Sequence, residues 1–428
     1  MEAKDINRIL GISESFKMPE ALMNVLMSNR CEEVMNQFIE VGESLDHDWF
    51  TQYFEEEHAN KSKMAQDFTP RGVSDLLSYI IGEVEKVADV CSGTGGLTIA
   101  QWNKNKNTRF YCYELSERAI PLLLFNLTIR NIEAQVVRMD ILTGERFQAW
   151  EVMKGNIYGR VVPCDIPEEF DKVDAVISNP PYSQKYNPKG DGRFLQFADM
   201  LPTNFADFVF VAFSLNILKE NSKMGFVLPH GVLFRGAKEQ KFRQMLIEHK
   251  MIKSVIGLPD KLFINTNIPV LILEIDTSCT CNDVMFIDAK NEALKAGKMN
   301  ILDEPHIQKI VEAIDKRENI ERFATVADLK TIEDNGYNLN IPRYVDTYIP
   351  EPLPNPIDLM KGLANTQREI YKTETELFKM LSEMEGTNKH SEATFAKTLA
   401  EYVKTLNDGE ESYKKEVTQI EFNRQNKM

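Results

Sequence analysis

The sequence lacks any apolar run long enough to cross a lipid bilayer, and its first residues lead into no signal-peptide hydrophobic stretch. We therefore expect a cytoplasmic protein. Cysteine is also scarce: the six cysteines are scattered, and the pair Cys279 and Cys281 has neither zinc-ligand nor thioredoxin-type spacing. This pattern favours reduced, structural thiols, and we expect no metal site.

Positive charge is in short supply. The 50 Lys and Arg residues stand against 65 Asp and Glu residues, which gives a formal net charge of -15. Because affinity for DNA comes largely from Lys and Arg at phosphates, this balance argues against unaided tight binding to a polyanion. If DNA is the substrate, we expect a basic partner protein to provide most of the binding affinity for DNA.

The pattern of apolar residues predicts three parts. Residues 1–60 have apolar positions at helical spacing, which predicts a small helical N-terminal region. Residues 61–349 alternate short β-rich runs with helical stretches, which predicts an α/β domain built on a doubly wound, mostly parallel sheet. The expected strands are Lys86–Cys91, Arg109–Tyr113, Gln135–Met139, Val173–Ile177, Met224–Leu228 and Ile252–Ile256.

The third part, residues 350–428, opens with closely spaced prolines between Pro350 and Pro356, which favour an extended connector and a domain boundary. Two amphipathic helices are expected beyond it, with a turn at Gly386–Asn388. Their apolar faces fit a partner surface and the chain's own catalytic domain equally well. The apolar positions are Ile370, Leu377, Leu381, Met384, Phe395, Leu399, Tyr402 and Leu406.

A glycine-rich turn, Asp89–Gly96, follows the first expected strand and precedes a helical stretch. Glycines at such a turn let a ligand approach the backbone, although many turns of this kind need glycine for geometry alone. Glu114 and Asp140 end the next two strands, so three acids would meet at one edge of the sheet. They would repel a pyrophosphate, and they suit a ligand with hydroxyls, an amine and a positive sulfonium better.

The sequence Asn179-Pro180-Pro181-Tyr182 follows the fourth expected strand. Consecutive prolines fix a stiff backbone with exposed carbonyl oxygens, and the neighbouring aromatic ring offers a flat stacking surface. The motif therefore predicts a rigid hydrogen-bond acceptor site beside a stacking platform.

These two motifs resemble those of the amino-methyltransferases that act on exocyclic amines of bases, in the order of their gamma class. Further stretches are similar to the modification subunits of type I restriction-modification systems, and the resemblance covers roughly residues 60–345. These stretches are Gln66–Pro70, Asp191–Phe194, Ala206–Phe208, Leu228–Gly236, Leu258–Phe263 and Tyr337–Tyr344.

The resemblance implies methylation of the N6 amino group of adenine in DNA, with S-adenosyl-L-methionine as cofactor. It implies that the cofactor's methionine part contacts Phe68 and Thr69, together with the Asp89–Gly95 loop. Glu114 would bind the ribose hydroxyls and Asp140 the adenine amino group. The loop residues expected at the cofactor are Asp89, Ser92, Gly93 and Gly95.

For catalysis, the resemblance implies that the Asn179 side-chain oxygen and the Pro180 carbonyl accept hydrogen bonds from the target amine and aim its lone pair at the methyl group. We count Asn179 among the cofactor-binding residues as well. Pro181 completes the motif, and Tyr182 is expected to stack on a flipped-out base. The displacement at a sulfonium methyl needs no metal and no covalent nucleophile.

Several residues keep two interpretations. Phe194 and its neighbour Arg193 are candidates for contacting the target base or DNA, but Phe194 fits a core or lid aromatic equally well. Thr69, taken by itself, fits the cap of a helix in which Pro70 is the first residue. His230 and Arg235 fit ordinary loop roles as well as catalytic ones.

As partners we expect DNA, a separate specificity subunit and two modification subunits per complex, with a restriction subunit as a further candidate. No segment resembles a DNA-reading domain, so residues 357–410 are a candidate docking region for the specificity subunit. The polar insertion between Asp140 and Val173 is expected to be a surface excursion. The alternatives are methylation of protein glutamine, RNA or cytosine N4, and a non-catalytic scaffold with the same fold.

Overall fold

The computed structural model divides the chain into two compact units, Met1–Tyr348 and Ile349–Met428, each described here by itself. Phe68, the turn at Gly386–Asn388 and most of the expected proline-rich connector lie outside the described residues. The structure describes residues 3–42, 44–50, 69–263, 268–297, 299–348, 355–384, 390–391 and 393–404.

The chain begins with the expected helices, α1 (Ala3–Leu10), α2 (Met18–Leu26) and α3 (Cys31–Val41), with a short 3-10 turn η1 (Ser15–Lys17) between the first two. Each helix buries apolar side chains, among them Ile6, Leu22 and Phe38. The helix α2 packs on α7 (Ile120–Ile129) of the following domain. Residues 44–50, which follow α3, are not helical.

A mixed sheet forms the centre of the first unit, and its strands lie in the order β13-β10-β8-β9-β7-β6-β1-β2-β3-β4-β5. The α/β prediction is confirmed, and each predicted strand is present. The strands are β1 (Lys86–Val90), β2 (Arg109–Glu114), β3 (Ala134–Met139), β4 (Arg146–Met153), β5 (Arg160–Cys164), β6 (Val173–Ser178), β7 (Leu218–Pro229), β8 (Ile252–Gly257), β9 (Val270–Asp276), β10 (Asp283–Asp288) and β13 (Ala324–Asp328).

The middle of the sheet is parallel, because β7, β6, β1, β2 and β3 pair in the same direction. The chain runs outward from β1 through β2 to β3 and then returns to place β6 on the other side of β1. This reversal makes the gap between β1 and β6 a topological switch point, the place where open α/β sheets bind ligands.

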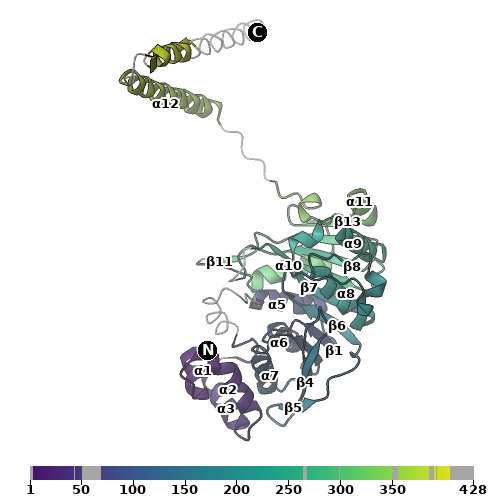
Figure 1. The fold of residues 1–428 in the computed structure, drawn as a ribbon. Coiled ribbons are helices and arrows are strands. Elements are labelled where there is room, and N and C mark those ends of the chain that lie inside the picture. Colours follow the sequence, from purple (N-terminus) through teal and green to yellow (C-terminus); the bar gives the residue numbers. More distant parts are fainter. Residues whose placement is uncertain are drawn as a thin grey trace. The chain divides into compact units, whose positions relative to one another are not determined.

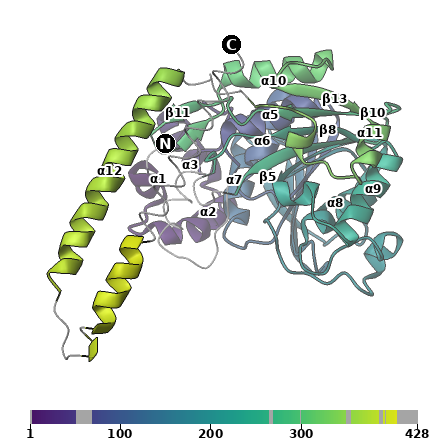
Figure 2. The same cartoon turned by 90° about the horizontal axis from the view of Figure 1, so that it is seen from above.

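Helices cover both faces of the sheet, as Figures 1 and 2 show. Side chains of successive strand residues alternate between two hydrophobic clusters, so the sheet is buried on both sides. One face carries α5 (Arg71–Ile81), α6 (Gly96–Lys104), α7 and α10 (Glu304–Lys316). The other carries α8 (Asp207–Ile217), α9 (Lys238–Glu248) and α11 (Leu329–Asp334).

Short elements complete the first unit. They are the 3-10 turns η2 (Gly192–Phe197), η3 (His230–Leu233) and η4 (Ile341–Arg343), and a small hairpin of β11 (Leu294–Ala296) and β12 (Met299–Ile301).

The insertion between Asp140 and Val173 is not the surface excursion that we expected. It contains β4 and β5, which pair antiparallel to β3 and to each other and extend the sheet by two strands. Trp150 and Val152 of β4 are buried in the cluster that α7 covers. The insertion therefore belongs to the core.

The second unit contains α12 (Pro356–Ser382) and a second helix over residues 393–404 (Figure 2). Pro356, which we placed in the connector, is the first residue of α12, where its missing N–H costs nothing. Large apolar side chains along α12 are exposed, including Ile370 and Leu377. None of the described helices combines the length and apolarity needed to cross a bilayer.

Candidate active site

The two motifs leave the sheet side by side at its switch point. Strands β1 and β6 are in register with Val90 opposite Ser178, so the glycine-rich loop and the Asn179 motif begin at neighbouring positions. The Ser178 hydroxyl donates a 2.5 Å hydrogen bond to the Val90 carbonyl and joins the two strand ends. The sequence predicted that both motifs follow strands, and the register adds that these strands are adjacent.

The loop after β1 is held in a fixed shape by backbone hydrogen bonds. The N–H groups of Cys91 and Ser92 donate to the Tyr113 carbonyl at 2.9 and 3.0 Å, and the Ser92 hydroxyl donates to the Asp89 carbonyl at 2.8 Å. Gly95 has φ +94°, and a Cβ there would lie 2.9 Å from Leu123 Cδ1. The positive φ therefore favours glycine at this position.

Glu114, at the end of β2, faces this loop. Its carboxylate accepts hydrogen bonds from the Gly93 N–H and the Ser116 N–H, both at 2.7 Å. The side chain is only 5% exposed. Two backbone donors thus orient the carboxylate at the position where the resemblance implies a ribose contact.

Asp89 is completely buried at the end of β1. Its Oδ2 accepts a 2.6 Å hydrogen bond from the Thr98 hydroxyl, whereas its buried Oδ1 has no hydrogen-bond partner among the described residues. Burial, reinforced by the nearby Glu114 charge, raises the pKa of Asp89 to about 7, against the effect of the Thr98 hydrogen bond. A buried acceptor without a partner is the condition that a hydrogen-bonding or cationic ligand would relieve.

The loop after β3 carries Asp140, which accepts a 2.8 Å hydrogen bond from the Leu142 N–H. Arg193 supports this loop from outside by donating to the carbonyls of Ile141, at 2.8 Å, and Leu142. Arg193 also pairs with Asp191. Its guanidinium is therefore engaged within the protein, where it holds the Asp140 loop.

Phe194 is fully buried, in the cluster beneath α8. A ring with no exposed surface has no face to offer to a base, so the core alternative fits this residue. This corrects the expectation that it contacts the target base, and Phe194 has no part in the function proposed below.

Asn179 and Tyr182 contact each other directly. The Tyr182 hydroxyl donates to Asn179 Oδ1 at 2.7 Å, and Asn179 Nδ2 donates to the Thr69 hydroxyl at 2.9 Å. Both side chains are half-buried, while Pro180 is buried and Pro181 is exposed. The amide oxygen is thus turned away from Thr69 and toward the tyrosine.

Thr69 does not cap a helix. The helix α5 begins at Arg71, one residue later than that interpretation required, and its N-cap Pro70 provides no side-chain hydrogen bond. The Thr69 carbonyl lies beside the glycine loop, because a Cβ at Gly96 would be 3.9 Å from it. Thr69 therefore stands between the two motifs.

Sequence reasoning missed two supports of the Asn179 motif. The Ser183 N–H donates to the fully buried Asp207 at 2.9 Å, and Asp207 pairs with Arg235 at 2.8 Å. The ring of Phe263 lies edge-on to that of Tyr182, with 6.4 Å between their centroids. Ala206–Phe208 and Leu258–Phe263 were recognised from the sequence only as stretches that resemble the family. Nothing in their local spacing indicates that Asp207 and Phe263 contact the Asn179 motif.

The donor set fits S-adenosylmethionine better than a metal ion. Among the described residues, no three His, Cys, Asp or Glu side chains are arranged to hold a metal. The switch point instead brings the Glu114 carboxylate and the buried Asp89 carboxyl group beside the glycine-rich loop. These groups match hydroxyls, an amine and a positive charge in the ligand.

Comparison with known proteins also indicates a methyltransferase. The family model described as N-6 DNA Methylase matches residues 23–351, which is most of the chain. The methylase subunit of the type I restriction enzyme MpnII from Mycoplasma pneumoniae is 30% identical over 65% of this chain and 53% of its own length. The methylase subunit of the type I enzyme MjaVII from Methanocaldococcus jannaschii is 27% identical over 87% of this chain and 67% of its own length.

A solved structure shares the fold. The methyltransferase subunit of a type I restriction-modification system from Streptococcus thermophilus superposes with a TM-score of 0.60 at 32% identity, covering 69% of this chain and 63% of that one. The chain thus spans between about half and two thirds of the length of these three relatives.

Proposed function

Because the chain belongs to the N-6 DNA methylase family, we propose that it transfers a methyl group from S-adenosylmethionine to the N6 amino group of adenine in DNA. The observation that carries this proposal is the junction of the two motifs at one switch point, with Asn179 Oδ1 fixed in direction by Thr69. An acceptor fixed in this way can orient a target amine without reorganising.

The cofactor would lie against the Asp89–Gly95 loop, where it supplies an electrophilic methyl group on a positively charged sulfur. Glu114 would accept hydrogen bonds from the ribose hydroxyls, with its carboxylate held by the Gly93 and Ser116 amides. Asp140 would accept from the adenine amino group. Thr69 and Phe68 would complete the methionine end, and a cationic ligand nearby would favour the ionised form of Asp89.

In catalysis, Asn179 Oδ1 and the Pro180 carbonyl would accept hydrogen bonds from the target amino group and localise its lone pair. The Tyr182 hydroxyl now occupies Asn179 Oδ1 at 2.7 Å. Because an amide oxygen can accept two hydrogen bonds, an entering amino group would share Asn179 Oδ1 with that hydroxyl or take its place. The Tyr182 ring, with Phe263 edge-on beside it, then stacks on the flipped base.

Assembly with other subunits is part of the proposal. The net charge of -15 leaves DNA affinity to a partner. We propose a separate specificity subunit that docks on the C-terminal helices, whose apolar side chains such as Ile370 and Leu377 are exposed. Two copies of this chain per complex, and a restriction subunit, follow from the likeness to type I modification subunits.

The direct test is to express the full chain with and without a specificity subunit from the same genome, and to map N6-methyladenine in cellular DNA at single-base resolution. Methylation at one motif, only with the partner, is the expected result. Asn179→Ala should lower methyl transfer about a hundredfold or more while the dissociation constant of S-adenosylmethionine stays nearly unchanged. A methylated RNA or protein product with unmodified DNA would contradict the proposal.

A further inference from the structure

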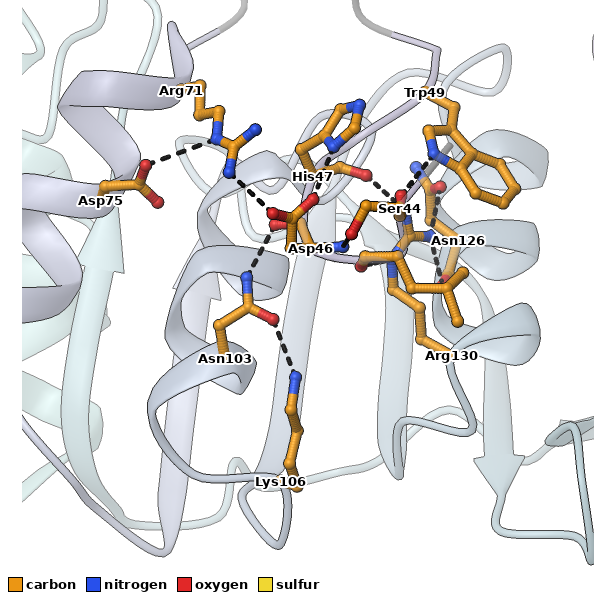
Figure 3. A network of polar contacts seen from close by, with 11 residues as sticks. Ser44, Asp46, His47, Trp49, Arg71, Asp75, Asn103, Lys106, Asn126 and Arg130 are labelled. Atoms are coloured by element: carbon orange, nitrogen blue, oxygen red, sulfur yellow. Dashed lines mark hydrogen bonds and ion pairs between the residues drawn. The ribbon is translucent and has the colours of Figure 1, made fainter. Parts of the chain in front are cut away.

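Residues 44–50, which we call the N-terminal strap, lie across the outer side of α6 and α7 (Figure 3). Asn103 of α6 donates to the Asp46 carbonyl at 2.7 Å, and Arg130, which follows α7, donates to the carbonyls of Leu45 and His47 at 2.8 and 2.5 Å. Phe50 is fully buried, with its ring against those of Phe38 and Phe125. The strap is thus an ordered part of the domain.

Asp48 is the strap residue that reaches the glycine-rich loop. Its Oδ2 accepts a 2.5 Å hydrogen bond from the Thr94 hydroxyl, and its Oδ1 accepts from Asn126 Nδ2 at 2.7 Å. The Phe50 N–H donates to the same Oδ1 at 2.9 Å and fixes the carboxylate from within the strap. These donors come from three separate parts of the chain.

Asn126 links Asp48 to Thr94 by a second route. This fully buried side chain donates from Nδ2 to the Thr94 carbonyl at 2.8 Å as well as to Asp48, and its oxygen accepts from Arg130 at 2.8 Å. Both the hydroxyl and the carbonyl of Thr94 are therefore held from behind. Thr94 itself is 1% exposed.

Thr94 lies in the loop between two glycines with positive φ, Gly93 at +55° and Gly95 at +94°. Glycines give a loop many alternative conformations, so its shape depends on what holds it. The Gly93 N–H is bound by Glu114, and Thr94 is bound by Asp48 through its hydroxyl and by Asn126 through its carbonyl. The loop is clamped between a ligand-binding acid and the strap.

We propose that Asp48 is a positioning residue for the cofactor: through Thr94 and Asn126 it holds the glycine-rich loop in the shape that binds S-adenosylmethionine. The inference rests on the proposed function, and it gives the N-terminal region a role at the cofactor site that sequence reasoning did not foresee. Preorganised loops bind more tightly because less ordering remains to be done on binding.

The test uses the full chain and measures the dissociation constant of S-adenosylmethionine by calorimetry, together with amide hydrogen exchange of residues 91–96 without cofactor. Asp48→Ala and the isosteric Thr94→Val should each weaken binding about tenfold and speed exchange of the loop. Thr94→Ser, which keeps the hydroxyl, should restore both values. Asn103→Ala removes a strap contact that does not reach Thr94, and it should leave both unchanged.

The variant that combines Asp48→Ala with Thr94→Val should bind no more weakly than Asp48→Ala alone, because Asp48→Ala already removes the hydrogen bond from Thr94. Wild-type affinity in Thr94→Val, or equal losses in Asn103→Ala and Asp48→Ala, would overturn the inference. If the wild-type chain bound no S-adenosylmethionine, the proposed function would fail instead. The exchange measurement would still decide whether Asp48 clamps the loop.

Discussion

The side chain of Asn179 is oriented by two neighbours of different kinds. Thr69 accepts from its nitrogen and Tyr182 donates to its oxygen, so the direction of the amide is set before a substrate arrives. The motif itself could be recognised from consecutive residues. Its orienting partner Thr69 could not, because it lies 110 positions away and its own surroundings fit a helix cap.

Thr69→Val should lower kcat about tenfold, because the amide of Asn179 loses the acceptor that fixes its orientation. Thr69→Ser should stay close to wild type. Steady-state methylation assays of the assembled enzyme, with titration of S-adenosylmethionine, measure kcat and the KM for the cofactor separately. A raised KM for the cofactor with unchanged kcat would instead assign the hydroxyl to the methionine part of the ligand.

Asp89 makes stability depend on pH. Its pKa is about 7 in the folded protein and 3.8 for an unperturbed aspartate, so between these pH values the folded state holds a proton that the unfolded state has lost. Stability therefore falls as pH rises through this window and levels off above about pH 7. In Asp89→Asn this fall in stability with pH should be absent, because the asparagine side chain cannot ionise.

We expect the melting temperature of Asp89→Asn, relative to wild type, to rise between pH 5 and pH 8. Scanning calorimetry of both proteins without cofactor across this range provides the measurement. A difference between the two melting temperatures that does not change with pH would show that Asp89 is ionised throughout.

At the scale of elements, the parallel strands were predictable because burial on both faces leaves continuous runs of Val, Ile and Ala. Strands β1, β2, β3, β6 and β8 match the expected bounds to within one residue at each end. The strands β4, β5, β9, β10 and β13 of the main sheet were missed. The run Arg146–Met153 carries polar residues among its apolar ones, and its burial depends on α7 and on pairing with β3, which a single segment does not reveal.

Helices α8 and α9 jointly hold the end of the Asn179 motif. Asp207 at the start of α8 binds the Ser183 N–H, and Arg235, just before α9, binds both Asp207 and Glu239. Ser183 has φ +57°, an uncommon conformation for a residue with a side chain. The buried carboxylate of Asp207 thus stabilises a turn that would otherwise relax.

Removing this carboxylate by Asp207→Ala should destabilise the fold by about 3 kcal/mol, because Arg235 loses a buried partner. It should also lower kcat by loosening the turn after Tyr182. Asp207→Asn keeps an acceptor for Ser183 and should lose less of kcat than Asp207→Ala. Urea denaturation and methylation assays of the two variants would test this, and equal activity in both would exclude the positioning role.

For the whole molecule, the prediction of an N-terminal helical part, a central α/β domain and C-terminal helices was possible because each differs in periodicity. The sequence did not reveal that the N-terminal part packs on α7 and sends Asp48 to the glycine-rich loop. Asp48 and Thr94 are 46 positions apart, and although Thr94 lies in the glycine-rich motif, Asp48 belongs to no recognisable motif.

A chain ending at Tyr348 should keep its fold and its affinity for S-adenosylmethionine, because the first compact unit contains every described residue of the site. It should lose binding to the specificity subunit if the exposed apolar side chains of α12 form the docking surface. Size-exclusion chromatography of the truncated and full chains, each mixed with that subunit, would show whether the truncated chain still binds it. Co-elution of the truncated chain would place the docking surface elsewhere.

The contact between Asp48 and Thr94 has a consequence that follows from thermodynamic reciprocity. If the strap increases the affinity of the loop for its ligand by some factor, the ligand must strengthen the attachment of the strap by the same factor. The helices α1, α2 and α3 precede the strap along the chain, and α2 packs on α7. A partner that pulled these helices from the domain would therefore act as an effector, releasing the cofactor without touching it.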